Sequence, residues 1–293
     1  MRSVRPLPGA AFLILSALLF SIMGVFVREA SQSVNNENVV FFRNLVGVVF
    51  FLPLLFAKGF APFRTTRVRS HVIRTGYGLA AMYCFFYAIA HLPLADAMIF
   101  TYAAPVFTPV LAWLWLREPL TRKMMLLSLV GMLGVILVGK PSGALFSKLS
   151  LVGIAASLLA ASAFVSIREM SSSEPAYRIV FYYALFSMLF SAVPLTWAWQ
   201  PLDSRQLMLL LGGGLVASMA QFSMSKAYSL APLGVIGPVA YSAIVFSGII
   251  GWWLWNEVPD TSSLVGALLI FSASLLSVLG KPPAPAPAAR PVN

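Results

Sequence analysis

The sequence repeats one unit of roughly 140 residues, and this repeat constrains the fold more than any other feature. The stretch 18–31 returns at 158–171, shifted by 140 positions, with six residues identical in register: Leu18, Leu19, Val25, Arg28, Glu29 and Ser31. The stretch 91–119 returns at 230–259, shifted by 139 positions, which pairs Tyr102 with Tyr241, Trp113 with Trp252 and Glu118 with Glu257. We therefore predict a first repeat over residues 1–143, a second over 144–281 and a tail over 282–293.

The composition predicts that a bilayer is the main solvent of this chain. Hydrophobic residues make up 59% of the sequence and charged residues 10%, whereas a soluble domain carries about 25% charged residues. Apolar stretches of about 20 residues, long enough to cross a bilayer, lie at 8–27, 38–57, 74–91, 94–116, 123–139, 149–167, 178–198, 206–229, 231–255 and 262–280. The sequence therefore predicts an all-α integral membrane protein with ten transmembrane helices, five in each repeat.

The distribution of lysine and arginine indicates the orientation, because cytoplasmic loops carry an excess of both. Fourteen of the twenty fall in the two termini and in the loops on the same side, Arg74 among them. The loops on the other side hold only Arg28, Lys140, Lys148 and Arg205. We therefore expect both termini in the cytoplasm, with the Pro- and Ala-rich tail disordered.

Five spans per repeat have a geometric consequence. An odd number forces the second repeat to enter the membrane from the opposite side, so that the two repeats are inverted with respect to each other. Two antiparallel copies of one packing unit can adopt two arrangements of similar energy, each open to one side. This pattern favours transport by alternating access around a cavity near the midplane. The alternative is a duplication that serves only the stability of the bundle.

The residues that catalysis requires do not form a recognisable group. His71 and His91 are far apart and lack a second ligand at metal spacing, and the sequence has no phosphate-binding glycine loop and no nucleophile elbow. The basic residues follow the loops and are not interleaved with aromatic residues, so nucleic acid is not expected as a partner. We predict that the protein is not an enzyme and uses neither a metal nor a cofactor.

Acidic residues bear on energy coupling, because an ion-coupled pump usually keeps a carboxylate inside the bundle. Eight of the nine acidic residues fall at span ends, and the ninth, Asp96, lies about one turn into a predicted span, where a helix cap is the more common role. We therefore expect movement of the substrate down its own gradient.

With few charges inside, a substrate site must consist of aromatic, hydroxyl and amide groups. Tyr83 and Tyr87 lie one turn apart on the third predicted span, and Ser218 and Gln221 belong to a polar stripe on the eighth. Lipid would penalise this stripe, so it should face the interior. Hydrogen bonding between helices explains such a stripe equally well. Gly214, the last of three consecutive glycines, marks either close packing or a hinge.

The fourth and ninth spans correspond in the repeat, and each carries a proline near a tyrosine: Pro105 with Tyr102, and Pro238 with Tyr241. Because proline lacks a backbone donor, kinked helices here would leave carbonyl groups free for a substrate. Two basic residues, Arg43 and Lys226, fall inside predicted spans. Snorkelling or pairing is the ordinary role of such residues; the more specific hypothesis is that Lys226 binds the carboxylate or phosphate of the substrate.

Three segments carry a resemblance to the drug/metabolite transporter superfamily, specifically to its ten-helix members with two EamA-type halves. They are PVFTPVLAWLWLREPL, ending beyond Glu118, its partner YSAIVFSGIIGWWLWNEVPD, and FFRNLVG around Arg43. Within the superfamily the chain is most similar to the bacterial amino-acid exporters of the YddG type. The resemblance implies an inner-membrane exporter of aromatic and other neutral amino acids. Independently of the resemblance, a monomer in the lipid bilayer is the expectation for this chain.

Two alternatives stay open within the superfamily. Proton-coupled drug efflux in its four-helix members uses a buried glutamate in the first helix, which has no counterpart here. A nucleotide-sugar or phosphate antiporter would need several basic groups that converge on the cavity, and the sequence offers only Lys226 and Arg43.

Overall fold

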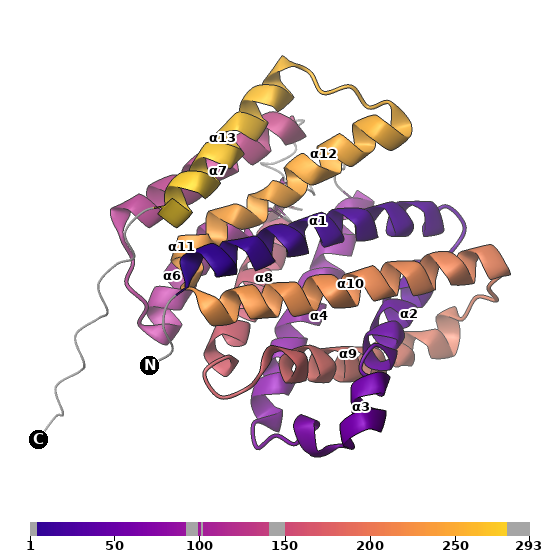
Figure 1. Cartoon of the computed structure of the whole chain (residues 1–293). Helices are drawn as coiled ribbons and strands as arrows, with labels where there is room; N and C mark the ends of the chain where they lie inside the picture. Colours follow the sequence, from indigo (N-terminus) through magenta and orange to yellow (C-terminus); the bar gives the residue numbers. More distant parts are fainter. Residues whose placement is uncertain (1–4, 92–98, 101, 141–149, 280–293) are drawn as a thin grey trace, which may run out of the picture.

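The computed structural model describes residues 5–91, 99–100, 102–140 and 150–279, and within these ranges the chain folds into helices without any strand (Figure 1). The first repeat contains α1 (Pro6–Ala30), α2 (Asn36–Val49), α3 (Leu52–Lys58), the short 3₁₀ turn η1 (Ala61–Phe63), α4 (Val68–His91), α6 (Ala104–Leu116) and α7 (Arg122–Gly139). The second contains α8 (Ser150–Met170), α9 (Ala176–Ala198), α10 (Ser204–Leu230), α11 (Leu233–Ile236), the 3₁₀ turn η3 (Gly237–Tyr241), α12 (Ser242–Trp255) and α13 (Thr261–Leu279).

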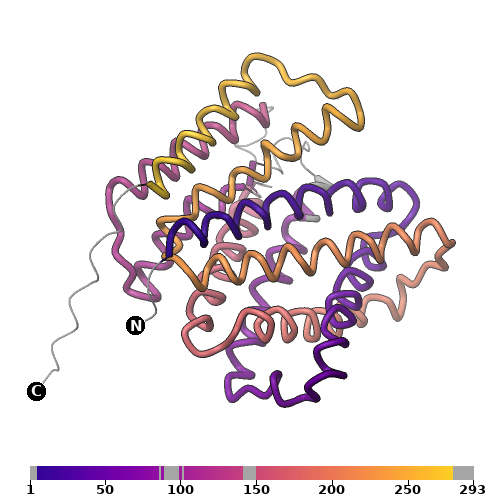
Figure 2. Tube along the Cα trace, in the orientation of Figure 1, coloured from indigo at the N-terminus to yellow at the C-terminus, as the bar shows by residue number. Residues whose placement is uncertain are grey.

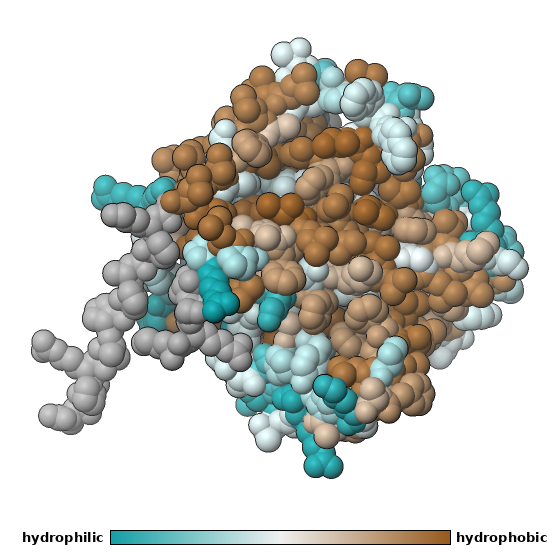
Figure 3. All heavy atoms as spheres, viewed as in Figure 1, coloured by the Kyte–Doolittle hydropathy of each residue, from teal (hydrophilic) through white to brown (hydrophobic). Residues whose placement is uncertain are grey.

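Eight segments of the described chain are long and apolar enough to cross a membrane, and α6 is a shorter apolar helix. The space-filling view shows a broad apolar band, with most hydrophilic residues toward the edges of the molecule (Figure 3). The helix α4 has 24 residues, which gives it a length of about 36 Å. Part of the predicted fourth span, 94–116, lies outside the described residues, and this part includes Asp96. The fold is thus that of a multi-pass membrane protein.

Two of the predicted spans are interrupted. The second span, predicted over 38–57, is present as the apolar segment Asn36–Lys58, but it breaks between α2 and α3 at Phe50 and Phe51, just before Pro53 in the first turn of α3. The ninth span breaks at η3, which contains Pro238. In both places a proline in the first turn needs no backbone partner for its nitrogen, which allows a new helix to start.

The bundle has two distinct ends, which can be followed in the ribbon and tube views (Figures 1 and 2). We call the end that carries Lys58, Arg64, Arg69, Arg117 and Arg122 the basic end, and the other the opposite end. The start of α1 lies at the basic end beside the end of α10, because the backbone N–H of Arg5 donates to the carbonyl of Leu230 at 2.9 Å. The end of α8 lies there too, because Arg168 donates to the carbonyl of Tyr228. Equivalent helices of the two repeats, such as α1 and α8, therefore run in opposite directions.

The packing of the helices follows the repeat. Helix α1 contacts α10, and their counterparts in the repeat, α8 and α4, contact each other in the same way. The same holds for α1 with α12 and α8 with α6, and for α2 with α10 and α9 with α4. Two further contacts, α2 with α9 and α7 with α13, join equivalent helices of the two repeats to each other. The two repeats are thus interlocked, since all of these contacts run between them.

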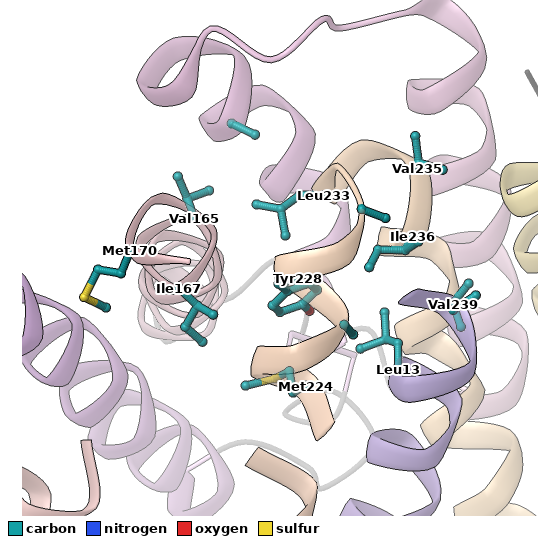
Figure 4. Close-up of a cluster of buried hydrophobic side chains, with 14 of the residues drawn as sticks. Leu13, Val165, Ile167, Met170, Met224, Tyr228, Leu233, Val235, Ile236 and Val239 are labelled. Atoms are coloured by element: carbon teal, nitrogen blue, oxygen red, sulfur yellow. The ribbon is translucent and has the colours of Figure 1, made fainter. Parts of the chain in front are cut away.

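The largest buried cluster of the described chain closes the basic end (Figure 4). This basic-end cluster consists of Ala10, Leu13, Ala112, Met124, Val165, Ile167, Met170, Ile179, Met224, Ala227, Tyr228, Ala231, Leu233, Val235, Ile236 and Val239. Figure 4 shows side chains of α1, α8, α10 and α11 directed toward one another. At the opposite end, the buried cluster around α1, α2 and α10 contains only Ala30, Val34, Val39 and Leu210, which we call the opposite-end cluster.

Candidate functional site

Each end of the bundle carries an ion pair, and the two pairs are related by the repeat. At the opposite end, Nη1 of Arg28 lies 2.9 Å from Oε1 of Glu257. At the basic end, Nε of Arg168 lies 2.7 Å from Oε1 of Glu118. The two arginines are 140 positions apart and the two glutamates 139. Each pair joins one repeat to the other, so each fastens the interface between them at one end.

The local backbone places both glutamates in the same way. The helices α6 and α12 end in a residue with left-handed backbone conformation, Arg117 with φ 56° and Asn256 with φ 55°. The N–H group of the following glutamate then donates back to a helix carbonyl at 3.3 Å, to Ala112 for Glu118 and to Gly251 for Glu257. This helix stop turns the carboxylate sideways, toward the arginine of the neighbouring helix.

The surroundings of the two ion pairs differ. At the basic end the side chains of Arg168 and Glu118 are only 21% and 15% exposed, and Glu118 also accepts from the backbone N–H of Leu233 at 3.2 Å. At the opposite end Arg28 and Glu257 are 50% and 54% exposed, and the guanidinium group lies over the ring of Trp255 at 3.9 Å. The basic-end pair therefore fastens α6, α8, the end of α10 and the start of α11, whereas the opposite-end pair fastens α1 to the end of α12.

Further polar contacts strengthen the basic end. Glu174 accepts from Arg178 at 2.7 Å and from Thr65 at 2.6 Å, and Arg67 donates to Glu169 at 2.8 Å. These bonds connect the segment between α3 and α4 to the segment between α8 and α9. The opposite end has more exposed pairs, Lys140 with Asp260 at 2.6 Å and Arg205 with Glu29 at 3.8 Å. Hydrogen bonds from Lys140, from Ser263 and, to the smallest extent, from Ser262 hold the pKa of the Asp260 carboxyl well below its usual value.

A second group of charged residues lies inside the bundle, where α2, α4, α9 and α10 meet. Arg74 on α4 is only 3% exposed. Its guanidinium carbon lies 3.6 Å from the ring centre of Tyr183, and Nη2 donates to Oε1 of Gln221 at 3.3 Å. Arg43 on α2 belongs to the same group, because its charge acts on both Tyr183 and Arg74. We call Arg43, Arg74, Tyr183 and Gln221 the arginine cluster.

The arginine cluster is incompletely satisfied. Nε of Arg43 and Nε and Nη1 of Arg74 are buried without a hydrogen-bond partner among the described residues, and Nη1 of Arg43 lies 4.0 Å from the sulfur of Met82. Among the residues that the structure describes, no carboxylate forms an ion pair with either arginine. The stack on Tyr183 offsets only about 0.5–2 kcal/mol, while an unpaired buried charge costs several kcal/mol.

The two residues predicted on α10 have different surroundings. Gln221 belongs to the arginine cluster. Ser218 donates to the carbonyl of Gly214 within the same helix at 2.7 Å, so its hydroxyl is already bonded. Gly214 lies in the unbroken interior of α10, where an added Cβ would meet Val46 at 2.7 Å. The described geometry gives Gly214 a role in the close packing of α10 on α2.

The four predicted tyrosines fall into two groups, because Tyr102 packs against the buried cluster that contains Tyr241, whereas the other two lie on α4. Tyr83 and Tyr87 on α4 are 42% and 48% exposed. Ser247 on α12 donates to Ser21 of α1 at 3.1 Å. Tyr241 is fully buried, and its hydroxyl donates to the carbonyl of Ser128 at 3.0 Å. A substrate contact for any of these tyrosines stays a prediction.

The two proline regions face each other, as the repeat requires. An added Cβ at Gly237, next to Pro238, would lie 4.0 Å from the carbonyl oxygen of Pro105, and α6 is in contact with both η3 and α11. The start of α6 and the break at η3, in corresponding spans, therefore meet at the interface between the repeats. Lys226 lies elsewhere, in a hollow of about 510 Å³ that Tyr177, Phe222, Ser229 and Arg5 also line. This volume is in the range of small-molecule sites.

Sequence reasoning missed part of the interior. Arg74 was expected in a cytoplasmic loop, but α4 begins at Val68, so Arg74 lies in its second turn and is buried; that expectation is wrong. Tyr183 was not singled out, although it lies 140 positions after Arg43 in the repeat. A predicted start of this helix at residue 68 would have placed Arg74 inside the bundle. His71, one turn before Arg74 on α4, is buried against the ring of Tyr182. The described residues contain no group of His, Cys, Asp or Glu that could hold a metal.

The arrangement of interlocked antiparallel repeats with paired ends is that of a membrane transporter. The sequence profile of the EamA-like transporter family matches residues 7–140 and 147–279, and the chain belongs to this family. It is 34% identical over 270 residues to the pseudopaline exporter CntI of Pseudomonas aeruginosa strain UCBPP-PA14, covering 91% of this chain and 94% of the relative.

More distant relatives differ in the direction of transport. The chain is 26% identical over 272 residues to an S-adenosylmethionine uptake transporter of Rickettsia prowazekii, covering 93% of this chain and 92% of that protein. A solved crystal structure shares the fold, with a TM-score of 0.79 at 16% identity, covering 92% of this chain and 96% of the other. The resemblance to the drug/metabolite transporters is thereby confirmed.

Proposed function

We propose that this transporter exports small amino-acid-like metabolites across the bacterial inner membrane, by alternating access and down the gradient of the substrate. In this proposal the chain crosses the membrane ten times, and both termini lie in the cytoplasm. The single observation that carries the proposal is the presence of equivalent ion pairs at the two ends, one largely buried and one largely exposed. The family membership and a relative that is named an exporter support it.

The mechanism follows from the inverted repeat. If the first repeat takes the conformation of the second, and the second that of the first, the surroundings of the two ion pairs are exchanged. Glu118 and Arg168 then become exposed as the basic end opens, while Arg28 and Glu257 become buried as the opposite end closes. A substrate between the repeats gains access first from one side and then from the other.

The excess of basic residues supports placing the basic end in the cytoplasm. The packed basic-end cluster then closes the cytoplasmic side. The structure therefore corresponds to a state of the transport cycle in which the substrate has already left the cytoplasm. The hollow beside Lys226, Tyr177 and Ser229 lies at this side and offers a place for the substrate to gather before the basic end opens.

The described carboxylates support facilitated movement rather than ion coupling. They lie at or near the helix ends, and most of them are paired with an arginine or a lysine: Glu29, Glu118, Glu169, Glu174, Glu257 and Asp260. A carboxylate engaged in an ion pair at the bundle end is not available to carry a proton across the interior.

The proposal is tested in liposomes that contain the purified protein and labelled phenylalanine, without any ion gradient. We expect saturable release that several unlabelled neutral amino acids suppress, compared with liposomes lacking protein. Release that starts only after a proton gradient is imposed would contradict facilitated movement. If phenylalanine, leucine, methionine and glutamate are all retained under both conditions, the proposed function is wrong.

A charge exchange at the exposed pair tests the mechanism in the same liposomes. Arg28→Glu places two carboxylates together and should slow phenylalanine release at least tenfold. Adding Glu257→Arg restores an ion pair of reversed direction and should recover most of the release. Equal rates in the wild type and in Arg28→Glu would contradict a role of this pair in closing the opposite end.

A further inference from the structure

We propose that the arginine cluster is an anion subsite that binds a carboxylate group of the transported molecule. The inference rests on the proposed function, which it makes more specific: the substrate must carry a free carboxylate, and an uncharged drug should not be accepted. The sequence-based expectation had assigned the substrate carboxylate to Lys226 alone, and it had counted Arg74 among the loop residues.

The first observation is the contrast between the interior and the end arginines. Arg28, Arg67, Arg168, Arg178 and Arg205 each lie within 4 Å of a carboxylate at a bundle end. Arg43 and Arg74 are the described arginines farthest inside their helices, and they have neutral neighbours instead, a phenol, an amide and a thioether. A membrane bundle that keeps two arginines together without a counter-charge has a strong electrostatic preference for an incoming anion.

The second observation is the set of unused donors. Nε and Nη1 of Arg74 lie on opposite sides of Nη2, which donates to Gln221, and both are buried without a partner within the described chain. Unused donors of a charged guanidinium group form strong, charge-assisted hydrogen bonds to carboxylate oxygens. Nε of Arg43 is likewise unpartnered. The cluster thus holds its positive charges in place through Tyr183 and Gln221 while leaving donors for a ligand.

The third observation is the location. The four residues come from α2 and α4 of the first repeat and from α9 and α10 of the second. A group bound there would bridge the two repeats, whose relative movement is the basis of alternating access. Arg74 is only 3% exposed, and the cavity of about 10 Å³ beside Arg43, which apolar residues and glycines otherwise line, is too small for a carboxylate. In this conformation the subsite is therefore closed, and a carboxylate enters only when α2 and α10 move apart.

The test compares ligands that differ only in the carboxylate. The thermal unfolding temperature of the purified full-length protein is measured with phenylalanine, with phenylalanine amide, with succinate and with inorganic phosphate, at equal ionic strength in chloride. We expect phenylalanine and succinate to raise the unfolding temperature and the amide to leave it unchanged. Stabilisation by phosphate alone, or the same shift with the amide as with phenylalanine, would overturn the carboxylate subsite, as would the absence of any shift.

Variants locate the effect within the molecule. Arg74→Gln and Arg43→Gln should each require at least tenfold more phenylalanine for the same shift, whereas Arg205→Gln, an exposed arginine at the opposite end, should behave as the wild type. Because the buried charges lack partners, the ligand-free Arg74→Gln protein should unfold at the same temperature as the wild type or higher. Should a glutamine variant fail to fold, Arg74→Lys keeps the charge but loses the separate guanidinium donors at Nε and Nη1, and should also bind at least tenfold more weakly. Unchanged binding in every folded cluster variant would contradict the proposal.

The two proposals can fail separately. Carboxylate-dependent binding that is lost in the Arg43 and Arg74 variants, without phenylalanine release from liposomes, would leave the subsite intact and contradict the proposed export. Release with an unchanged half-saturating concentration in Arg74→Gln would leave export intact and contradict the subsite.

Discussion

The basic end and the opposite end of the bundle contain the same ion pair in different surroundings. Glu118 and Glu257 follow equivalent helix stops, and each faces an equivalent arginine. The basic-end cluster, however, contains sixteen buried residues, whereas the opposite-end cluster contains four. An inverted duplication supplies equivalent parts to both ends, but a conformation that is closed on one side only must use them differently.

The largest difference is expected when the glutamates are neutralised. Glu118→Gln leaves Arg168 partly buried without its counter-charge, which should lower the free energy of unfolding by about 3 kcal/mol. Glu257→Gln, at the exposed pair, should lower it by less than about 1 kcal/mol. Denaturant unfolding of both variants in the same detergent measures the two losses. Equal losses would show that the two pairs do not differ in burial under these conditions.

Substitutions in the buried clusters should also destabilise the basic end more than the opposite end, but the two losses of unfolding free energy should differ by less than for the glutamates. Ile179 in the basic-end cluster and Val39 in the opposite-end cluster are 140 positions apart in the repeat and are 0% and 6% exposed. Ile179→Ala should cost about 2–4 kcal/mol, because the cavity it leaves has rigid neighbours, and Val39→Ala about 1–2 kcal/mol. A larger loss for Val39→Ala in the same unfolding measurement would contradict a tighter basic end.

The smallest effect concerns pH at the opposite end. Hydrogen bonds from Lys140 and Ser263 hold the pKa of Asp260 below its ordinary value. A lowered pKa in the folded protein stabilises it above the pKa of the unfolded chain, about 3.9, and this stabilisation is lost as the pH falls below that value. Because the carboxyl is fully exposed, we expect a slightly shallower acid dependence of the unfolding temperature in Asp260→Asn. The Ser262→Ala variant, which keeps the ion pair, should follow the wild type.

Much of the fold could be predicted from the sequence, because membrane helices depend on local composition. The predicted spans 123–139 and 206–229 agree closely with α7 and α10, and Arg28 and Arg168 were recognised as equivalent. The break between α2 and α3 was not predicted, since Pro53 in the middle of an apolar run is compatible with a kinked continuous helix.

The candidate site was less predictable, because it depends on contacts between distant residues. Arg28 and Glu257 are separated by 229 positions and Arg74 and Gln221 by 147, and no local pattern specifies such pairs. Arg74 was assigned to a loop because charge alone was used to end the span, whereas in the structure an aromatic ring and an amide accommodate it. Gln221 was selected correctly as an inward-facing polar residue, but not its partner.

The most direct test of alternating access is to cross-link each end in turn and measure phenylalanine release. In a Cys84→Ser background, which removes the free cysteine, one variant carries Arg168→Cys with Glu118→Cys and another carries Arg28→Cys with Glu257→Cys. A short bifunctional thiol reagent with a reducible linkage should slow phenylalanine release at least tenfold in both variants. Reduction of the cross-link should restore the release rate. Undiminished release with the basic end cross-linked would contradict the exchange of conformations between the two repeats.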